Sequence, residues 1–186
     1  ILGDIGAGKS FVSKQFNCPL FNADKEVAEI YKYDRSCYLK IKKALPKYII
    51  SDQLDKKFLL KAVLDSKNNL KKISKIVHPI VRTRMNKFLT KNRMKKLVVL
   101  DIPLYLENKL NKRGDVLIFV DAKRKDIQKR LKNRKYFSEK IHKKLKSLHL
   151  PLRKKRKLSN FVIKNTFNAS KIQNDVKKIK TKILKI

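Results

Sequence analysis

The sequence predicts an α/β fold in which a parallel sheet is flanked by helices. Three observations favour this fold class. A glycine-rich phosphate-binding loop at residues 3–10 follows the apolar pair Ile1 and Leu2, as it would follow the end of a strand. Short, almost continuously apolar runs come later, as is typical of parallel strands covered on both faces. Segments with helical spacing lie between these runs, so strands and helices alternate after the loop.

The loop reads Gly3-Asp4-Ile5-Gly6-Ala7-Gly8-Lys9-Ser10, a complete G-x-x-x-x-G-K-[ST] motif. Its glycines let backbone N–H groups turn toward phosphate oxygens, Lys9 can reach the β- and γ-phosphates, and the Ser10 hydroxyl can bind Mg²⁺. A chance glycine-rich turn is the alternative, but three of the four glycines in the chain fall in this loop. The motif therefore predicts nucleoside triphosphate binding, and Phe11, Val12 and Phe16 predict a helix behind it.

The remaining elements follow from apolar runs and helical spacing. Strands are predicted at residues 20–21, 97–102, 116–120 and 161–163. Helices are predicted at residues 25–33, at 124–134, and in the last segment, where Ile172, Val176, Ile179 and Ile183 share one face.

Two stretches depart from the alternation, and we call them the helical insert (residues 34–95) and the lid segment (residues 122–157). The insert is lysine-rich, with Leu, Ile and Val at helical intervals beside the sheet. The lid segment is dense in Arg and Lys, and such a segment can close over a nucleotide in phosphoryl-transfer enzymes. An ordinary solvated pair of helices is the alternative. Residues 1–186 are predicted to form a single domain that contains both stretches.

The net charge is +35, with 50 Lys and Arg against 15 Asp and Glu. Such a balance invites a nucleic-acid interpretation. The lysines are spread through nearly every segment, however, and the abundance of Lys, Ile and Asn is typical of drift in an AT-rich genome. We therefore expect no specific nucleic-acid partner, although a positive field would attract small polyanionic substrates.

The cellular setting is predicted from what the sequence contains. Its apolar runs are too short to span a membrane, no signal peptide is recognised, and Cys18 and Cys37 lack metal or redox spacing. A cytoplasmic protein without a membrane partner is expected. The chain begins without Met and with a short first strand, so we expect further residues before Ile1.

Two carboxylates come directly after predicted strands, where open parallel sheets bind ligands. Asp24 could accept a proton from an attacking hydroxyl or help hold a metal, or it could cap the helix at 25–33. Asp101 ends an apolar run that resembles a Walker B strand, so it could bind Mg²⁺ directly or through water.

Other polar residues carry weaker predictions. Glu107 is either a site residue or a surface carboxylate, and the sequence favours the surface. Arg130 and Arg134 share a helix face and could neutralise charge on a transferred phosphoryl group. A lone His before Pro, as in His78-Pro79, is more typical of a structural turn, and no partner spacing predicts zinc.

Together these segments resemble the dephospho-coenzyme A kinase family. The phosphate loop is similar to the family's own loop, although that motif alone is generic. The other similar segments run in order along nearly the whole chain: Asn22-Ala23-Asp24, Leu54-Asp55-Lys56, His78-Pro79, Pro103-Leu104-Tyr105-Leu106-Glu107, Gln128 to Arg134, and Ser159 to Asn165. This ordered set of segments is specific to the family, unlike the phosphate loop alone.

The resemblance implies phosphorylation of the ribose 3′-hydroxyl of dephospho-coenzyme A by ATP, the last step of coenzyme A biosynthesis. It implies that Asp24 is the general base and that the insert holds the acceptor. The remaining implied roles are ATP binding by Gly6, Ala7, Gly8, Lys9, Ser10, Phe11 and Asn165, catalysis by Lys9, Arg130 and Arg134, acceptor binding by Asp24, His78, Pro103 and Glu107, and Mg²⁺ binding by Ser10 and Asp101.

The sequence also departs from the family. Asn22 and Asn160 replace Asp residues, Leu145 stands where Arg is usual, and His149 stands where Gln is usual. Activity is still expected, because Lys9, Ser10, Asp24 and the two lid arginines remain. Another P-loop nucleoside or nucleotide kinase is the first alternative. A nucleic-acid-binding ATPase is the second, and it would need a continuous basic stripe with aromatic residues.

Overall fold

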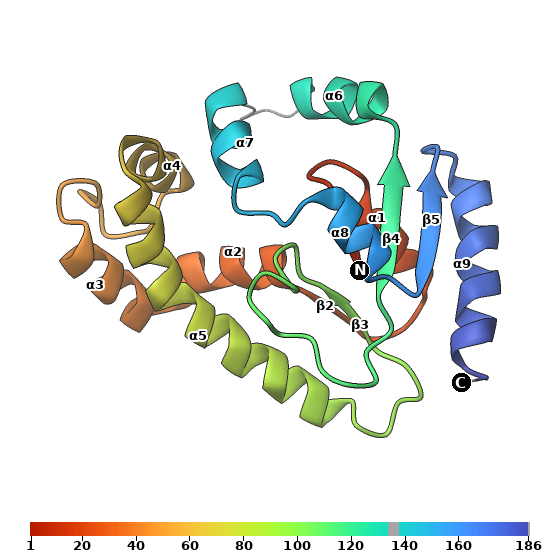
Figure 1. Cartoon of the computed structure of the whole chain (residues 1–186). Coiled ribbons are helices and arrows are strands. Elements are labelled where there is room, and N and C mark those ends of the chain that lie inside the picture. The colour runs from red at the N-terminus through yellow and green to blue at the C-terminus, as the bar shows by residue number, and fades with distance from the viewer. Residues whose placement is uncertain (134–137, 186) are drawn as a thin grey trace.

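The computed structural model describes residues 1–133 and 138–185 of the chain (Figure 1). In chain order its elements are β1 (Leu2–Gly3), α1 (Lys9–Gln15), β2 (Leu20–Asn22), α2 (Ala23–Tyr33), α3 (Arg35–Ala44), α4 (Lys56–Asp65), α5 (Lys67–Lys91), β3 (Val99–Asp101), β4 (Ile118–Ala122), α6 (Arg124–Lys132), α7 (Glu139–Lys146), α8 (Leu152–Lys157), β5 (Phe161–Asn165) and α9 (Ala169–Ile183). None of the described helices is long and apolar enough to cross a membrane.

The strands are parallel and form two groups, β1-β4-β5 and β2-β3. The backbone nitrogen of Ile1 donates a hydrogen bond to the Leu100 carbonyl oxygen at 2.8 Å, which joins β3 to the start of β1. The carboxyl ends of all strands therefore meet at one edge of the molecule. The predicted α/β fold, a parallel sheet flanked by helices, is confirmed.

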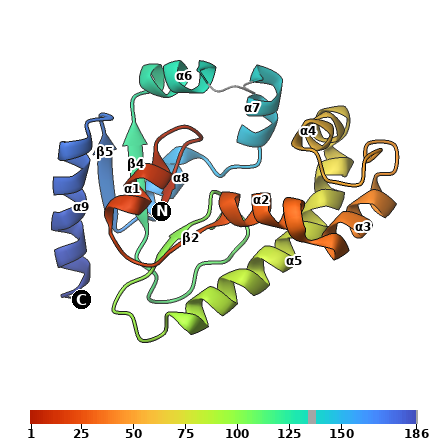
Figure 2. The same ribbon diagram turned by 180° about the vertical axis from the view of Figure 1, so that it is seen from behind.

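Helices cover both faces of the strands. Helix α1 packs against α9 and β3, whereas α8 packs against β1 from the other side, as the two opposite views show (Figures 1 and 2). The core between α1, the strands and α9 includes Val12, Phe16, Ile163, Ile172 and Val176, all of them buried. The predicted apolar face of the last helix thus lies against the sheet.

The helical insert contains α3, α4 and α5, which share an apolar cluster with α2. Helix α5 continues through Pro79, so the interpretation of His78-Pro79 as a turn is wrong. A proline inside a helix removes one backbone hydrogen bond. Val77 and Met85 are buried on the two sides of Pro79, and this packing keeps the helix continuous.

The connection between β3 and β4 is folded back on the core. Ile102 and Tyr105 are buried in a cluster with Phe21 and Met85. The Tyr105 hydroxyl donates a hydrogen bond to Asp115 Oδ2 at 2.7 Å. This packing fixes the position of residues 103–110, which follow the carboxyl end of β3.

Candidate active site

The phosphate loop has a backbone that only glycine adopts easily. Gly6 and Gly8 have φ values of 86° and 88°, in the left-handed region. A Cβ atom on Gly8 would lie 2.3 Å from Asn165 Nδ2, and one on Gly3 would lie 2.7 Å from the Val120 carbonyl oxygen. The loop is therefore pressed against β4 and β5, and no larger side chain fits at these positions.

Asn165, at the end of β5, forms a hydrogen bond to the phosphate loop. Its Nδ2 donates to the Ala7 carbonyl oxygen at 2.8 Å, and its Oδ1 accepts from the Phe167 backbone N–H at 2.7 Å. The residue is only 3% exposed. Both polar groups of the side chain are thus engaged within the protein, and ATP binding by Asn165 stays a prediction.

Lys9 begins α1, and its ammonium group lies within the loop. Lys9 Nζ donates to the carbonyl oxygens of Asp4 at 2.8 Å and Gly3 at 3.4 Å. Burial lowers the pKa of Lys9, while the negative charge of Asp101 opposes that shift. Ser10 and Phe11 are exposed in the first turn of the same helix, and a helix N-terminus attracts anions.

Asp101 is a buried carboxylate at the end of β3, only 3% exposed. Asn22 Nδ2 donates to Asp101 Oδ2 at 2.8 Å, while Asn22 Oδ1 accepts from the Lys25 backbone N–H at 2.8 Å. Asn22 is therefore the N-cap of α2, and the interpretation of Asp24 as the cap is wrong. The helix begins at Ala23, so Asp24 lies in its first turn and is exposed.

The Ser10 hydroxyl and the Asp101 carboxylate are candidate ligands of a metal ion. Magnesium is usually held by one or two carboxylates together with substrate phosphates. The Ser10 hydroxyl in the first turn of α1 and the Asp101 carboxylate at the end of β3 provide such oxygen donors. Residues 1–133 and 138–185 contain no group of three or more His, Cys, Asp or Glu side chains that could hold a metal ion. This donor set fits an ion that arrives with a nucleotide.

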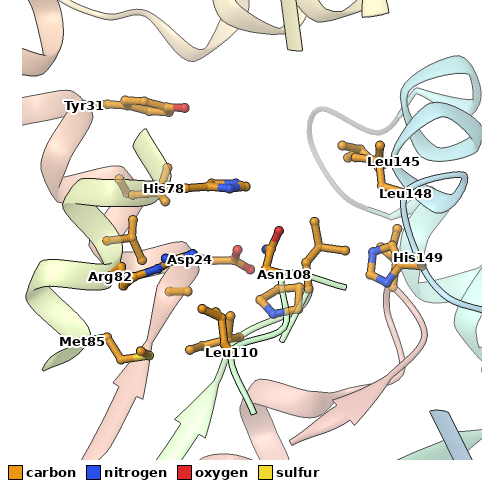
Figure 3. Close-up of a pocket in the computed structure, with 18 residues that line it drawn as sticks. Asp24, Tyr31, His78, Arg82, Met85, Asn108, Leu110, Leu145, Leu148 and His149 are labelled. Carbon is orange, nitrogen blue, oxygen red and sulfur yellow. The ribbon is translucent and has the colours of Figure 1, made fainter. Parts of the chain in front are cut away.

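A cavity of about 570 Å³ opens between α2 and α5 on one side and the lid segment on the other (Figure 3). Three residues predicted to bind the acceptor, Asp24, His78 and Pro103, line it. The other lining residues are mostly apolar: Ile5, Ala23, Val27, Ala28, Tyr31, Val81, Arg82, Met85, Ile102, Leu104, Asn108, Leu110, Leu145, Leu148 and His149. Ile5 belongs to the phosphate loop, so the cavity adjoins that loop.

Sequence analysis missed Arg82 and Asn108, two polar residues of this wall. Arg82 lies one turn after His78 on α5, and both side chains point into the cavity (Figure 3). Burial lowers the pKa of His78, and the positive charge of Arg82 lowers it further. The i, i+4 spacing of His78 and Arg82 is present in the sequence. It predicts a shared helix face only if the helix continues through Pro79, which the sequence analysis assigned to a turn.

Arg130 of α6 lies next to the phosphate loop. Its guanidinium carbon is 4.5 Å from the centre of the Phe167 ring. A Cβ on Gly8 would lie 3.5 Å from that ring, which places the stacked pair beside the loop. The sequence analysis assigned no role to Phe167. Arg134 lies outside the described residues, so its role stays a prediction.

Helix α7, within the lid segment, contacts both the helical insert and the phosphate loop. Lys144 Nζ donates to the carbonyl oxygens of Val63 and Leu64 at the end of α4, the latter at 3.1 Å. Lys146 Nζ lies 3.4 Å from Asp4 Oδ2 in the phosphate loop. The lid segment is thus in contact with both the insert and the loop.

A buried ion pair anchors the other end of the lid segment. Glu107 Oε1 accepts from Lys155 Nζ at 2.6 Å and from the Leu150 backbone N–H at 2.9 Å. Burial alone would raise the pKa of Glu107, but the hydrogen bonds from Lys155 and Leu150 outweigh it and lower that pKa. The interpretation of Glu107 as a surface carboxylate is wrong, because its side chain is only 10% exposed. Contact of Glu107 with the acceptor stays a prediction.

A glycine-rich loop that leads into α1, at the carboxyl edge of a parallel sheet and under a basic helical segment, defines a P-loop phosphotransferase. Comparison with known families narrows this class. The dephospho-CoA kinase family model matches residues 1–171. The chain belongs to the dephospho-CoA kinase family.

Individual relatives agree with this assignment. The dephospho-CoA kinase of the Wolbachia of Brugia malayi is 32% identical over 184 residues, covering 96% of this chain and 94% of the relative. The Bacillus cereus dephospho-CoA kinase is 32% identical over 186 residues, covering 95% and 92%. A crystal structure from Thermus thermophilus superposes with a TM-score of 0.79 at 25% identity, covering 97% of this chain and 94% of that one. Dephospho-CoA kinase from Campylobacter jejuni shares the fold, with a TM-score of 0.64 at 20% identity and coverage of 98% and 95%.

Proposed function

We propose that this chain transfers the γ-phosphoryl group of ATP to the ribose 3′-hydroxyl of dephospho-CoA, which yields CoA and ADP. Family membership supports the reaction. The observation in the structure that supports it best is that a single cavity brings Asp24 of α2 together with Ile5 of the phosphate loop and with residues of the insert and the lid segment. An alcohol bound in this cavity reaches a carboxylate and a bound triphosphate at the same time.

The chain's own residues divide the work. Backbone N–H groups of Gly6, Ala7 and Gly8 and the Lys9 ammonium hold the phosphates of ATP. The Asp24 carboxylate accepts the proton of the attacking hydroxyl while a bond forms between the ribose oxygen and the γ-phosphorus. The bond between that phosphorus and the β–γ bridging oxygen breaks, and ADP leaves.

Further groups stabilise the charge that moves in this step. Ser10 and Asp101 would hold Mg²⁺, which neutralises negative charge on the β- and γ-phosphates when it is bound. Arg130 and Arg134 of the lid segment would add positive charge around the transferred group. We assign acceptor binding to the helical insert, and we place the reaction in the cytoplasm, where the free thiols Cys18 and Cys37 stay reduced.

An ADP-release assay with Mg-ATP tests the proposal. The acceptors are dephospho-CoA, AMP, UMP, adenosine and single-stranded DNA. We expect turnover with dephospho-CoA to exceed turnover with every other acceptor. Equal or faster turnover with a nucleoside monophosphate would favour another P-loop nucleotide kinase, and ADP release stimulated only by DNA would favour a nucleic-acid-binding ATPase.

A further inference from the structure

His149 lies in the connection between α7 and α8 and forms part of the cavity wall. Its side chain is only 9% exposed. The ring lies across the cavity from Asp24 and His78, with Leu145 and Leu148 on its own side (Figure 3). His149 is therefore a polar group placed among apolar neighbours of the lid segment.

One edge of the ring is occupied by Lys155. Lys155 Nζ lies 2.9 Å from His149 Nδ1, and the same ammonium group lies 2.6 Å from Glu107 Oε1. Lys155 is completely buried, and Glu107 fixes its position. The ammonium group can therefore not turn away from the ring without leaving its carboxylate.

The chemistry of this contact determines the protonation of the ring. An ammonium group only donates hydrogen bonds, so Nδ1 must present a lone pair. A neutral imidazole that accepts at Nδ1 carries its proton at Nε2. Burial and the positive charges of Lys155 and Lys9 lower the pKa of His149 to about 4, while the negative charges of Glu107 and Asp4 oppose that shift. The ring is thus neutral near physiological pH, with a single defined donor.

That donor is the ring nitrogen that remains available to the cavity. Nδ1 is directed toward the buried Lys155, so Nε2 points away from that contact, and the ring forms part of the cavity wall. A neutral donor beside Leu145 and Leu148 suits an uncharged acceptor atom on a largely apolar ligand, since hydrogen bonds of this kind give orientation within apolar pockets.

We propose that His149 binds the phosphoryl acceptor, with its Nε2–H donating a hydrogen bond to an oxygen or ring nitrogen of bound dephospho-CoA. The inference rests on the proposed function, because it takes the cavity as the site of that substrate. Lys155 and Glu107 act as positioning residues, since they hold the ring and select its tautomer.

Two substitutions of His149 distinguish the proposed hydrogen bond from Nε2–H to the acceptor from the contact between Nδ1 and Lys155. In His149→Gln the amide oxygen can accept from Lys155 while the amide N–H₂ group donates into the cavity. In His149→Met the thioether fills similar space and accepts weakly, but it donates nothing. We expect His149→Gln to keep the KM for dephospho-CoA within about twofold and His149→Met to raise it about threefold to tenfold, the net worth of one neutral hydrogen bond.

The KM for ATP and the melting temperature serve as controls. Both should stay close to those of the unsubstituted chain in the two variants, because the ring does not bind the nucleotide in this proposal. A His149→Met enzyme whose KM for dephospho-CoA is unchanged, or whose KM rises for ATP alone, overturns the inference. If the unsubstituted chain itself fails to phosphorylate dephospho-CoA, the proposed function fails instead.

Nitrogen NMR of ¹⁵N-histidine-labelled protein gives a readout that does not depend on turnover. The chain has three histidines, so spectra of His149→Gln and His142→Gln assign the signals. We expect His149 to show an unprotonated Nδ1 and a protonated Nε2 from about pH 5.5 to 8. Dephospho-CoA without ATP should shift the Nε2–H signal, and a non-hydrolysable ATP analogue alone should not. An Nδ1–H tautomer, or no response to dephospho-CoA, contradicts the inference.

Discussion

The Asn165 amide nitrogen donates a hydrogen bond to the Ala7 carbonyl oxygen at 2.8 Å, so the last strand of the sheet holds the phosphate loop in shape. Asn165→Ala removes this buried hydrogen bond and also the acceptor of the partly buried Phe167 N–H. We expect a loss of about 1–3 kcal/mol in the free energy of unfolding and a weaker affinity for ATP. Urea denaturation and a fluorescent ATP-analogue titration measure the two effects.

Asn168 offers a matched control for this prediction. Its side-chain oxygen caps α9 by accepting a hydrogen bond from the Lys171 N–H at 3.0 Å. Asn168→Ala should cost about 1 kcal/mol of stability and leave ATP affinity unchanged. Equal loss of ATP affinity in both variants would show that Asn165 acts only through global stability.

Asp24 carries the prediction about catalysis. Because Asn22 caps α2, Asp24→Asn removes no helix cap and should leave the melting temperature nearly unchanged. The amide cannot accept the hydroxyl proton, so turnover should fall by about a hundredfold to ten-thousandfold. Steady-state kcat with saturating ATP and dephospho-CoA measures the loss.

Asp34 provides the opposite behaviour for comparison, because its carboxylate caps α3 by accepting from the Cys37 N–H at 2.8 Å. Asp34→Ala should lower the melting temperature and keep kcat per folded molecule. An Asp24→Asn enzyme that turns over normally would mean that the base lies elsewhere, with Asp101 the next candidate.

The buried pair of Glu107 and Lys155 should be strongly coupled. Lys155→Met leaves a buried carboxylate without its cation, which typically costs about 3–5 kcal/mol. Adding Glu107→Gln removes that charge, so the double variant should be more stable than Lys155→Met alone. Urea denaturation of the two single variants and the double variant gives the coupling energy, and strict additivity would contradict the importance of the pair.

Acid should destabilise the protein through His149. Its pKa is lowered from 6.5 to about 4 in the folded state, so the unfolded chain binds the proton more readily. The free energy of unfolding is therefore unaffected by this ring at a pH above its unfolded-state pKa of 6.5. It falls as the pH drops from 6.5 toward 4, by up to roughly 3 kcal/mol. The lowered pKa of Glu107 acts in the same direction in more acidic solution.

Denaturation curves at neutral pH and at about pH 5 test this dependence. His149→Gln removes the titrating ring and should lose less stability over that interval than the unsubstituted chain. Parallel losses in the two proteins would show that His149 does not carry the effect.

Local patterns predicted most of the fold. The glycine-rich loop, the apolar runs and the face formed by Ile172, Val176 and their neighbours reflect periodicities that the backbone imposes, and each became the expected element. Helix α5 was the exception, because packing of Val77 and Met85 outweighs the helix-breaking tendency of Pro79.

The site was less predictable where it depends on contacts between distant residues. Nothing in a chain with 50 Lys and Arg marks Lys155 as buried, since its burial follows from how α8 packs against the segment after β3. The same contact turned Glu107 from an expected surface residue into a buried one. The His149 tautomer depends on both of these residues, so sequence alone could not give it.

The close approach of Gly8 to Asn165 also concerns the order in which the chain is made. A ribosome releases the phosphate loop long before it releases β5, and folding during synthesis proceeds from the N-terminus. Until Asn165 has emerged, the Ala7 carbonyl lacks its amide partner, and the loop lacks its contact with β5. A nascent chain of this protein should therefore bind ATP tightly only after β5 has been synthesised.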